Sequence, residues 1–156
     1  MSLFDVLFGT STQKSKQGEF AERWDAGVKA FDKKDGATAA KIFRPFAEQG
    51  SADAQFRMAH LLLEGMGVPA NNEEGFYWLN KAAMQKHEGA LFMSGLAGMW
   101  NDPKNSYMIF YACSLISGVN GVGAKDLEKL LTSTSATLNQ QEIAQAQAAA
   151  RAFLRA

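Results

Sequence analysis

The feature that most constrains the fold is a pattern that returns after 36 residues. The run ADAQFRMAHLLLEG (52–65) aligns with EGALFMSGLAGMWN (88–101), which places Ala59 opposite Gly95. A shorter copy occupies residues 23–50 and also has a glycine at this position. Such a period is typical of stacked helix pairs, each of which buries its apolar surface on the next pair. Small residues are expected at these equivalent positions, because a larger side chain would hold paired helices apart.

Between the two helices of the middle unit, the sequence predicts a sharp stop and restart. Gly65 and Gly67 each cost about 1 kcal/mol inside a helix, so the first helix is expected to end there. Pro69 holds the residue before it in an extended conformation, which delays the next helix. Asn71 is a suitable N-cap for that helix, and Glu74 lies three residues later at the capping-box position. A positive φ is expected at Gly67, where a β-carbon would be strained.

The residues of the middle unit also follow a family pattern. They read Ala54-x3-Met58-Ala59-x2-Leu62-x2-Gly65-x-Gly67-Val68, followed by Gly75-x2-Trp78-x2-Lys81-Ala82-Ala83. This pattern resembles the Sel-one-like repeat, a relative of the tetratricopeptide repeat, although Ala59 and Gly75 replace the usual Gly and Ala of that family. The first unit lacks the Gly-x-Gly-Val loop, and the third has NDPKN in its place, as expected of end units.

The resemblance, which covers roughly residues 20–118, implies an all-α fold. The expected architecture is an α-solenoid of antiparallel helix pairs, with about three repeats and a C-terminal capping helix. The repeats and cap are expected to form a single domain over residues 19–156, with a helix that begins at Asn139-x-x-Glu142 in the cap. The expected boundaries of the units are about 19–50, 51–87 and 88–121, followed by the cap at 122–156.

An apolar segment and a linker are expected before the repeats, in residues 1–18. Leu3, Phe4, Leu7 and Phe8 form one apolar stripe that suits docking on a partner, on a membrane or on the first repeat. The sequence from Gly9 to Gly18, GTSTQKSKQG, has the composition of a flexible linker.

Composition and charge exclude several classes of protein. Sixteen basic residues balance sixteen acidic ones, so nucleic-acid binding is not expected. The apolar run at the start is too short for a signal peptide, and no run approaches the roughly 20 residues of a membrane span. One cysteine, Cys113, fits a reducing compartment. The expected location is the cytoplasm, and membrane association is not expected.

One narrow polar strip remains on the first helix of the middle unit when its residues are placed at 100° intervals. In related superhelices this helix lines the concave surface, so the strip and its equivalents in the other units are expected to bind a protein or peptide partner. Two alternatives remain, a merely solvated face and coverage of the apolar members by the C-terminal helices. The candidate residues are Asp53, Arg57, His60 and Glu64 in the middle unit, Asp25 and Asp32 in the first, and Met93, Leu96 and Trp100 in the third.

No constellation of residues indicates catalysis, a metal or a cofactor. Ser11-x-x-Lys14 has no partner motif, and His60 and His87 lack the spacing of zinc ligands. Cys113 is expected to be a buried, unreactive thiol. The sequence therefore favours a non-catalytic adaptor or scaffold with an unknown protein or peptide partner and an open oligomeric state. The alternative is a localisation or accessory factor that acts through the apolar segment at the start of the chain.

Overall fold

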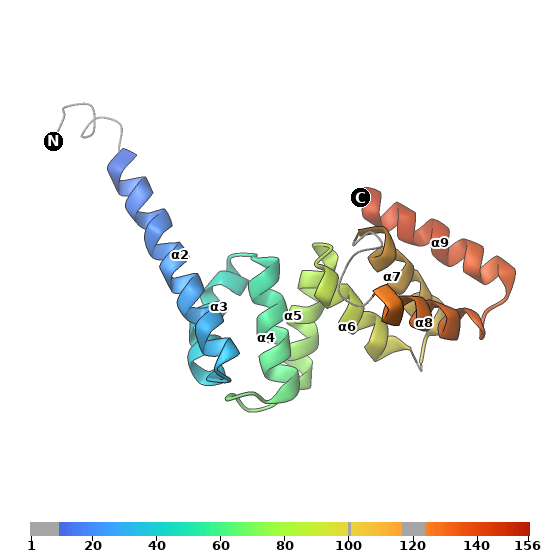
Figure 1. The fold of residues 1–156 in the computed structure, drawn as a ribbon, viewed down its shortest axis with the longest axis horizontal. Coiled ribbons are helices and arrows are strands. Elements are labelled where there is room, and N and C mark those ends of the chain that lie inside the picture. The colour runs from blue at the N-terminus through green and yellow to red at the C-terminus, as the bar shows by residue number, and fades with distance from the viewer. Residues whose placement is uncertain (1–9, 100, 117–123) are drawn as a thin grey trace. The chain divides into compact units, whose positions relative to one another are not determined.

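Every regular element in the described part of the chain is a helix. The computed structural model describes residues 10–99, 101–116 and 124–156, without the side chains of residues 10–17 and 124. No strand occurs in these ranges, so the all-α prediction is confirmed. The helices (Figure 1) are α2 (Thr10–Asp32), α3 (Gly36–Glu48), α4 (Ala52–Glu64), α5 (Asn72–Met84), α6 (Glu88–Gly98), α7 (Pro103–Ile116), α8 (Ala124–Ser135) and α9 (Gln140–Arg155).

The chain divides into two compact units. Unit 1 extends to Gly75 and includes α2, α3 and α4, whereas unit 2 begins at Phe76 and includes most of α5 and the helices α6 to α9. In unit 1, α3 packs against both α2 and α4, and in unit 2, α7 packs against α6, α8 and α9. That residues 19–156 form a single domain stays a prediction.

The interpretation of Gly9 to Gly18 as a flexible linker was wrong. Helix α2 begins at Thr10, so all of this segment after Gly9 is helical. Its Gln and Lys residues are good helix formers, and Gly18 alone interrupts them with about 1 kcal/mol of helix cost. Because Phe20 and Trp24 pack on Phe46, the nucleus of the helix is already fixed, and further turns add at little cost. Residues 1–9, which contain the expected apolar stripe, lie outside the described residues.

Small residues mark the places where helices approach closely, as the repeat predicted. A β-carbon on Gly27 of α2 would lie 2.8 Å from side-chain atoms of both Ile42 and Phe43 in α3. In unit 2, a β-carbon on Gly95 of α6 would lie 2.5 Å from the ring of Phe110 in α7. Both phenylalanine side chains are completely buried. The equivalent glycines therefore allow equivalent helix contacts in the two units.

The loop after α4 also follows the prediction. Helix α4 ends at Glu64, and Gly65 is its C-cap in the left-handed region, with a φ of 65°. Gly67 has a φ of 69°, and a β-carbon there would lie 2.6 Å from the backbone nitrogen of Ala37 at the start of α3. The side chain of Asn71 accepts a hydrogen bond from the Glu74 backbone N–H at 3.1 Å, which caps α5. Glycine is needed at position 67 for two reasons, its backbone angle and its contact with α3.

N-caps recur with the period of the repeat. Ser51 Oγ accepts from the Ala54 N–H at 3.4 Å, and 36 residues later His87 Nδ1 accepts from the Ala90 N–H at 3.2 Å. The role of His87 was not recognised in the sequence, because histidine is an uncommon N-cap. The capping box predicted at Asn139 is present, with both of its hydrogen bonds at 2.9 Å.

Cys113 of α7 is buried, as predicted, and its environment suppresses ionisation. Burial raises the pKa of the Cys113 thiol from an ordinary value of 9.0 to about 12, and the negative charge of Glu88 adds to this effect. Because the pKa of this thiol is higher in the folded state than in the unfolded chain, the protonated thiol stabilises the folded state. This contribution is fully present below about pH 9. This contribution is lost as the pH rises from about 9 through 12.

We expect the rate at which a thiol reagent labels Cys113 at pH 8 to be roughly a hundredfold or more lower in the native protein than in the denatured protein. The reason is that a buried, protonated thiol must first be exposed by local opening. The time course of disulfide exchange with and without guanidinium measures the ratio. Similar rates in the two conditions would show that Cys113 is accessible in the native protein.

Candidate partner-binding surfaces

On unit 1, the polar strip predicted on α4 lies against aromatic side chains of α2 and α3. The guanidinium carbon of Arg57 lies 5.9 Å from the ring centroid of Trp24, 5.1 Å from that of Phe31 and 5.4 Å from that of Phe43. The rings of His60 and Phe31 meet edge to face, with their centroids 5.5 Å apart. A guanidinium within about 6 Å of ring faces is attracted by the ring quadrupoles. These contacts therefore join α4 to α2 directly.

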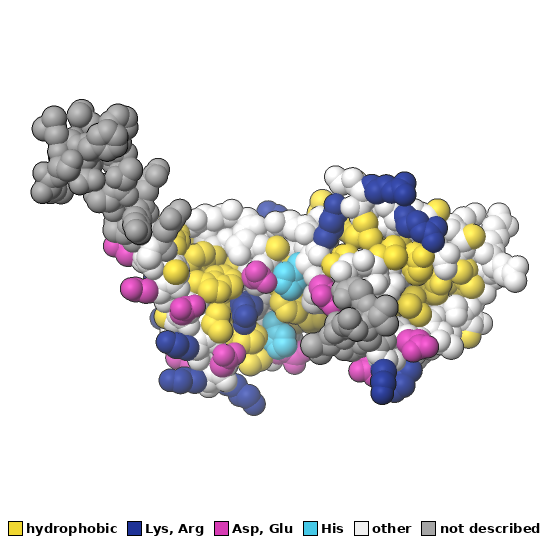
Figure 2. Space-filling view, turned by 45° about the horizontal axis from the view of Figure 1, so that its top comes forward, with side chains coloured by type: hydrophobic (Ala, Val, Ile, Leu, Met, Phe, Trp, Pro, Cys, Tyr) yellow, Lys and Arg dark blue, Asp and Glu magenta, His cyan; other side chains and the backbone are white. Residues whose placement is uncertain are grey.

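We call this surface the α2/α4 face and define it by Trp24, Asp25, Phe31, Asp32, Asp53, Arg57, His60 and Glu64. The four carboxylates are exposed, whereas the rings and the guanidinium are partly buried. In the part of Figure 2 that shows α2 and α4, apolar side chains surround a Lys or Arg and have Asp and Glu side chains along their border. The surface thus combines an aromatic and cationic floor with an acidic border.

The structure changes the interpretation of two candidates and adds two residues. Arg57 and His60 are in contact with aromatic rings, and are not a purely solvated strip. Trp24 and Phe31 belong to the same surface, although neither was among the candidate residues. Their helical spacing of seven residues, which places them on one side of α2, is the signal that could have identified them. A binding role for this face stays a prediction.

The candidates from the third unit lie in unit 2. Leu96 is exposed and Met93 is partly buried, while Trp100 lies outside the described residues. The interpretation that the C-terminal helices cover these residues is wrong for Leu96, because α8 and α9 pack on α7.

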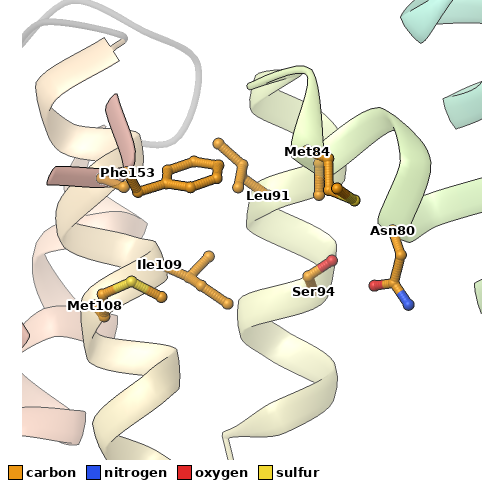
Figure 3. Close-up of a pocket in the computed structure, with 9 residues that line it drawn as sticks. Asn80, Met84, Leu91, Ser94, Met108, Ile109 and Phe153 are labelled. Atoms are coloured by element: carbon orange, nitrogen blue, oxygen red, sulfur yellow. The ribbon is translucent and has the colours of Figure 1, made fainter. Parts of the chain in front are cut away.

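A pocket that the sequence did not reveal lies among four helices of unit 2. It has a volume of about 420 Å³, and α5, α6, α7 and α9 contribute to its walls. Figure 3 shows Phe153, Ile109 and Leu91 turned toward one another across the space between α7 and α6. No pattern along the chain relates α9 to α5, so the sequence carried no signal for it. We call it the unit 2 pocket; its lining residues are Asn80, Ala83, Met84, Leu91, Ser94, Met108, Ile109, Ala112 and Phe153.

Two features of the described residues concern metal binding and membrane insertion. Within residues 10–99, 101–116 and 124–156, no group of three or more His, Cys, Asp or Glu side chains is arranged to hold a metal ion. No helix of the same ranges is both long and apolar enough to span a membrane.

Comparisons with known proteins agree with the repeat architecture. Residues 52–87 match the family model of the Sel1 repeat. The fold is similar to the crystal structure of a protective antigen from uropathogenic Escherichia coli strains that displays an SLR fold, with a TM-score of 0.74 and 22% sequence identity. The match covers 92% of this chain and 32% of the antigen, so this chain spans about a third of that protein.

A second relative is an exopolysaccharide production negative regulator from Rhizobium meliloti, which is 38% identical over 53 residues. This stretch is 34% of the present chain and 20% of the regulator. The family match, the fold similarity and the observed helix pairs agree with the solenoid architecture that the sequence predicted. Repeats of this family generally mediate protein–protein interactions. Residues 52–87 are therefore identified as a Sel1 repeat, within an all-helical fold similar to that of a protein with an SLR fold.

Proposed function

We propose that this protein is a non-catalytic adaptor that binds a protein or peptide partner on the α2/α4 face. The observation that carries the proposal is the position of Arg57 over three aromatic rings on a partly exposed surface. Trp and Arg are enriched among the residues that dominate binding energy at protein interfaces. The usual role of Sel1-like repeats and the regulatory name of one relative support the same coarse function.

The chemistry of the face suits a peptide with basic and apolar side chains. Exposed carboxylates at Asp25 and Asp32 on α2, and at Glu64 on α4, attract positive charge without being part of the core. The aromatic floor, over which Arg57 already lies, offers apolar contact. Peripheral charges of this kind act mainly on association rate and salt dependence, whereas the buried aromatic contacts slow dissociation. The partner is then a basic, partly apolar segment of another protein.

A selection from a random peptide library displayed on phage tests this proposal. We expect the wild-type chain to enrich peptides that combine Lys or Arg with large apolar residues. The double variant Asp25→Lys, Asp32→Lys is expected to bind the enriched peptides roughly tenfold or more weakly, because the border charge is reversed. Fluorescence anisotropy with the synthetic peptides at two salt concentrations measures both affinity and salt dependence.

The matched control is the double variant Glu48→Lys, Glu73→Lys. It makes the same change in net charge at exposed positions of unit 1. These positions lie on α3 and α5, the second helices of the first and middle repeats, and not on the α2/α4 face. We expect its peptide affinity to equal that of the wild type. Enrichment of acidic peptides, or equal losses of affinity in both double variants, would contradict a specific role of the α2/α4 face.

Residues 1–9 lie outside the described residues, so the alternative function through the apolar segment also stays a prediction. A cytoplasmic location and the absence of nucleic-acid partners also stay predictions.

A further inference from the structure

The unit 2 pocket is apolar, open at one border and large enough to hold side chains of another molecule. Its volume of about 420 Å³ lies within the range of about 300–1,000 Å³ that is usual for ligand sites. None of the nine lining residues carries a charge. Met84 at its border is 75% exposed, a high value for a large apolar side chain. Flexible methionine side chains, such as Met84 and Met108, adapt readily to apolar anchors of a partner.

One polar atom of the pocket has no hydrogen-bond partner. The Ser94 hydroxyl oxygen is buried, and nothing in the described part of the chain bonds to it. Figure 3 shows this hydroxyl on the side of α6 that faces Asn80 and Met84. Buried hydroxyl groups in native proteins are almost always hydrogen-bonded. An occupant that brings a carbonyl or carboxylate oxygen would satisfy it.

Positive charge lies beside the pocket. The Lys86 ammonium donates a hydrogen bond to the carbonyl oxygen of Leu154 at 3.1 Å, next to the lining residue Phe153. Arg151 and Arg155 are exposed on the same last turns of α9. In the part of Figure 2 that shows α9, Lys and Arg side chains border an apolar surface. The pocket therefore favours an occupant that is apolar and acidic.

The chain itself contains a segment of this chemistry. The sequence MSLFDVLF has an apolar stripe of Leu3, Phe4, Leu7 and Phe8, and its one charged side chain is the acidic Asp5. Leucine and phenylalanine at such spacing are typical anchors in an apolar groove. The segment thus complements the unit 2 pocket in both polarity and charge.

Helix α2 begins well before its first described ring contact with α3. Helix α2 begins at Thr10, and residues 18–23 are all exposed. The first described ring contact of α2 with α3 is made by Phe20, whose ring centroid lies 5.9 Å from that of Phe46. Ten helical residues span about 15 Å, so Thr10 lies about that far along α2 from this ring contact.

We infer that the unit 2 pocket binds the apolar segment, residues 1–8, of a second copy of this chain. Leucine and phenylalanine side chains enter the pocket, and Asp5 lies near the cationic border formed by Lys86 and α9. Because the segment and the pocket are different surfaces, the contact is head-to-tail, and a bound pair of copies still has one free segment and one free pocket. The protein then self-associates in a concentration-dependent manner. This inference does not depend on the α2/α4 face.

Sedimentation velocity of the full chain over a wide range of concentrations tests the inference. We expect the mean mass to rise above that of the monomer as concentration increases. The segment variant Phe4→Asp, Phe8→Asp and the pocket variant Met84→Asp should each weaken association roughly tenfold or more, because each places a charge in an apolar contact. Leu115→Asp is the matched control, since Leu115 is exposed in unit 2 and is not part of the pocket. It should associate like the wild type.

A mixture of the segment variant and the pocket variant gives a sharper result. One partner has an intact pocket and the other an intact segment, so a head-to-tail contact forms between them once and cannot continue. We expect the mixture to contain a one-to-one dimer that neither variant forms alone. Thermal melting should be unchanged in both variants, because Met84 is exposed and the segment precedes the described helices.

Several outcomes would overturn the inference. A wild-type chain that stays monomeric at all concentrations, or a mixture with no dimer, would show that no second copy occupies the pocket. Association that survives Met84→Asp would place the contact elsewhere. Flotation with anionic phospholipid vesicles that depends on Phe4 and Phe8 but not on Met84, in a monomeric chain, would assign the segment to a membrane.

Discussion

Replacement of Phe43 by alanine is expected to lower the free energy of unfolding of unit 1 by about 4 kcal/mol, the usual cost of truncating a fully buried phenylalanine. Phe43 is completely buried, and its ring contacts those of Trp24 and Phe31, with centroids 5.2 and 6.4 Å apart. It also lies under Arg57. The truncation therefore leaves a cavity and removes part of the floor of the α2/α4 face. Native-state hydrogen exchange of the amides of α2 and α3 measures the loss.

Phe20→Ala is the matched control for this substitution. Phe20 is 46% exposed and makes an edge contact with Phe46, so its truncation should cost about 1 kcal/mol. A double-mutant cycle of Phe43→Ala with Arg57→Ala should show a coupling of about 1 kcal/mol, the usual contribution of a partly exposed cation–π contact. Equal costs for Phe43→Ala and Phe20→Ala would contradict the position of Phe43 in the core.

The second large effect is expected at the loop after α4. Gly67→Ala should lower the free energy of unfolding by about 3 kcal/mol, since two costs combine. The positive φ of 69° costs an L-residue about 1–2 kcal/mol. The new β-carbon would also lie 2.6 Å from the backbone nitrogen of Ala37 and 2.9 Å from the Cα of Gly36, and backbone atoms cannot move aside easily. Urea denaturation followed by circular dichroism measures the change in midpoint.

Gly65→Ala separates the two costs. Its φ of 65° is almost the same, but the nearest atom to an added β-carbon is the Ala70 side chain, at 3.3 Å. This variant should therefore lose only about 1 kcal/mol, the cost of the backbone conformation. If Gly67→Ala and Gly65→Ala shift the midpoint equally, the close contact between the loop and α3 does not contribute to stability.

The loop and the repeat period were predictable because their causes are local. Two glycines and a proline stop a helix wherever they occur, and an asparagine can cap the next one within three residues. The small residues at Gly27 and Gly95 were found by alignment of the repeat with itself, and the structure supplies the rings that they accommodate. Local chemistry and periodicity thus determined the helix pairs, the loop after α4 and the buried state of Cys113.

The start of α2 shows where composition was misleading. The sequence from Gly9 to Gly18 resembles a linker, yet the structure has helix from Thr10 onward. Composition measures the average preference of a short segment, whereas an existing helix lowers the cost of each added turn. The helix is nucleated by the packing of Phe20 and Trp24 on α3, which composition does not describe.

Only the tertiary structure decided which side chains meet at the candidate sites. Arg57 was predicted to lie on a polar strip, but its contacts with Trp24 and Phe31 depend on the distance between α4 and α2. The unit 2 pocket combines Met84 with Phe153, which lie far apart in the sequence. Helical periodicity fixes the direction of a side chain around its own helix axis, and it leaves open how neighbouring helices are rotated and displaced. The sequence by itself therefore determined the helices and their repeat, whereas the packing of those helices determined the aromatic floor of the α2/α4 face and the pocket.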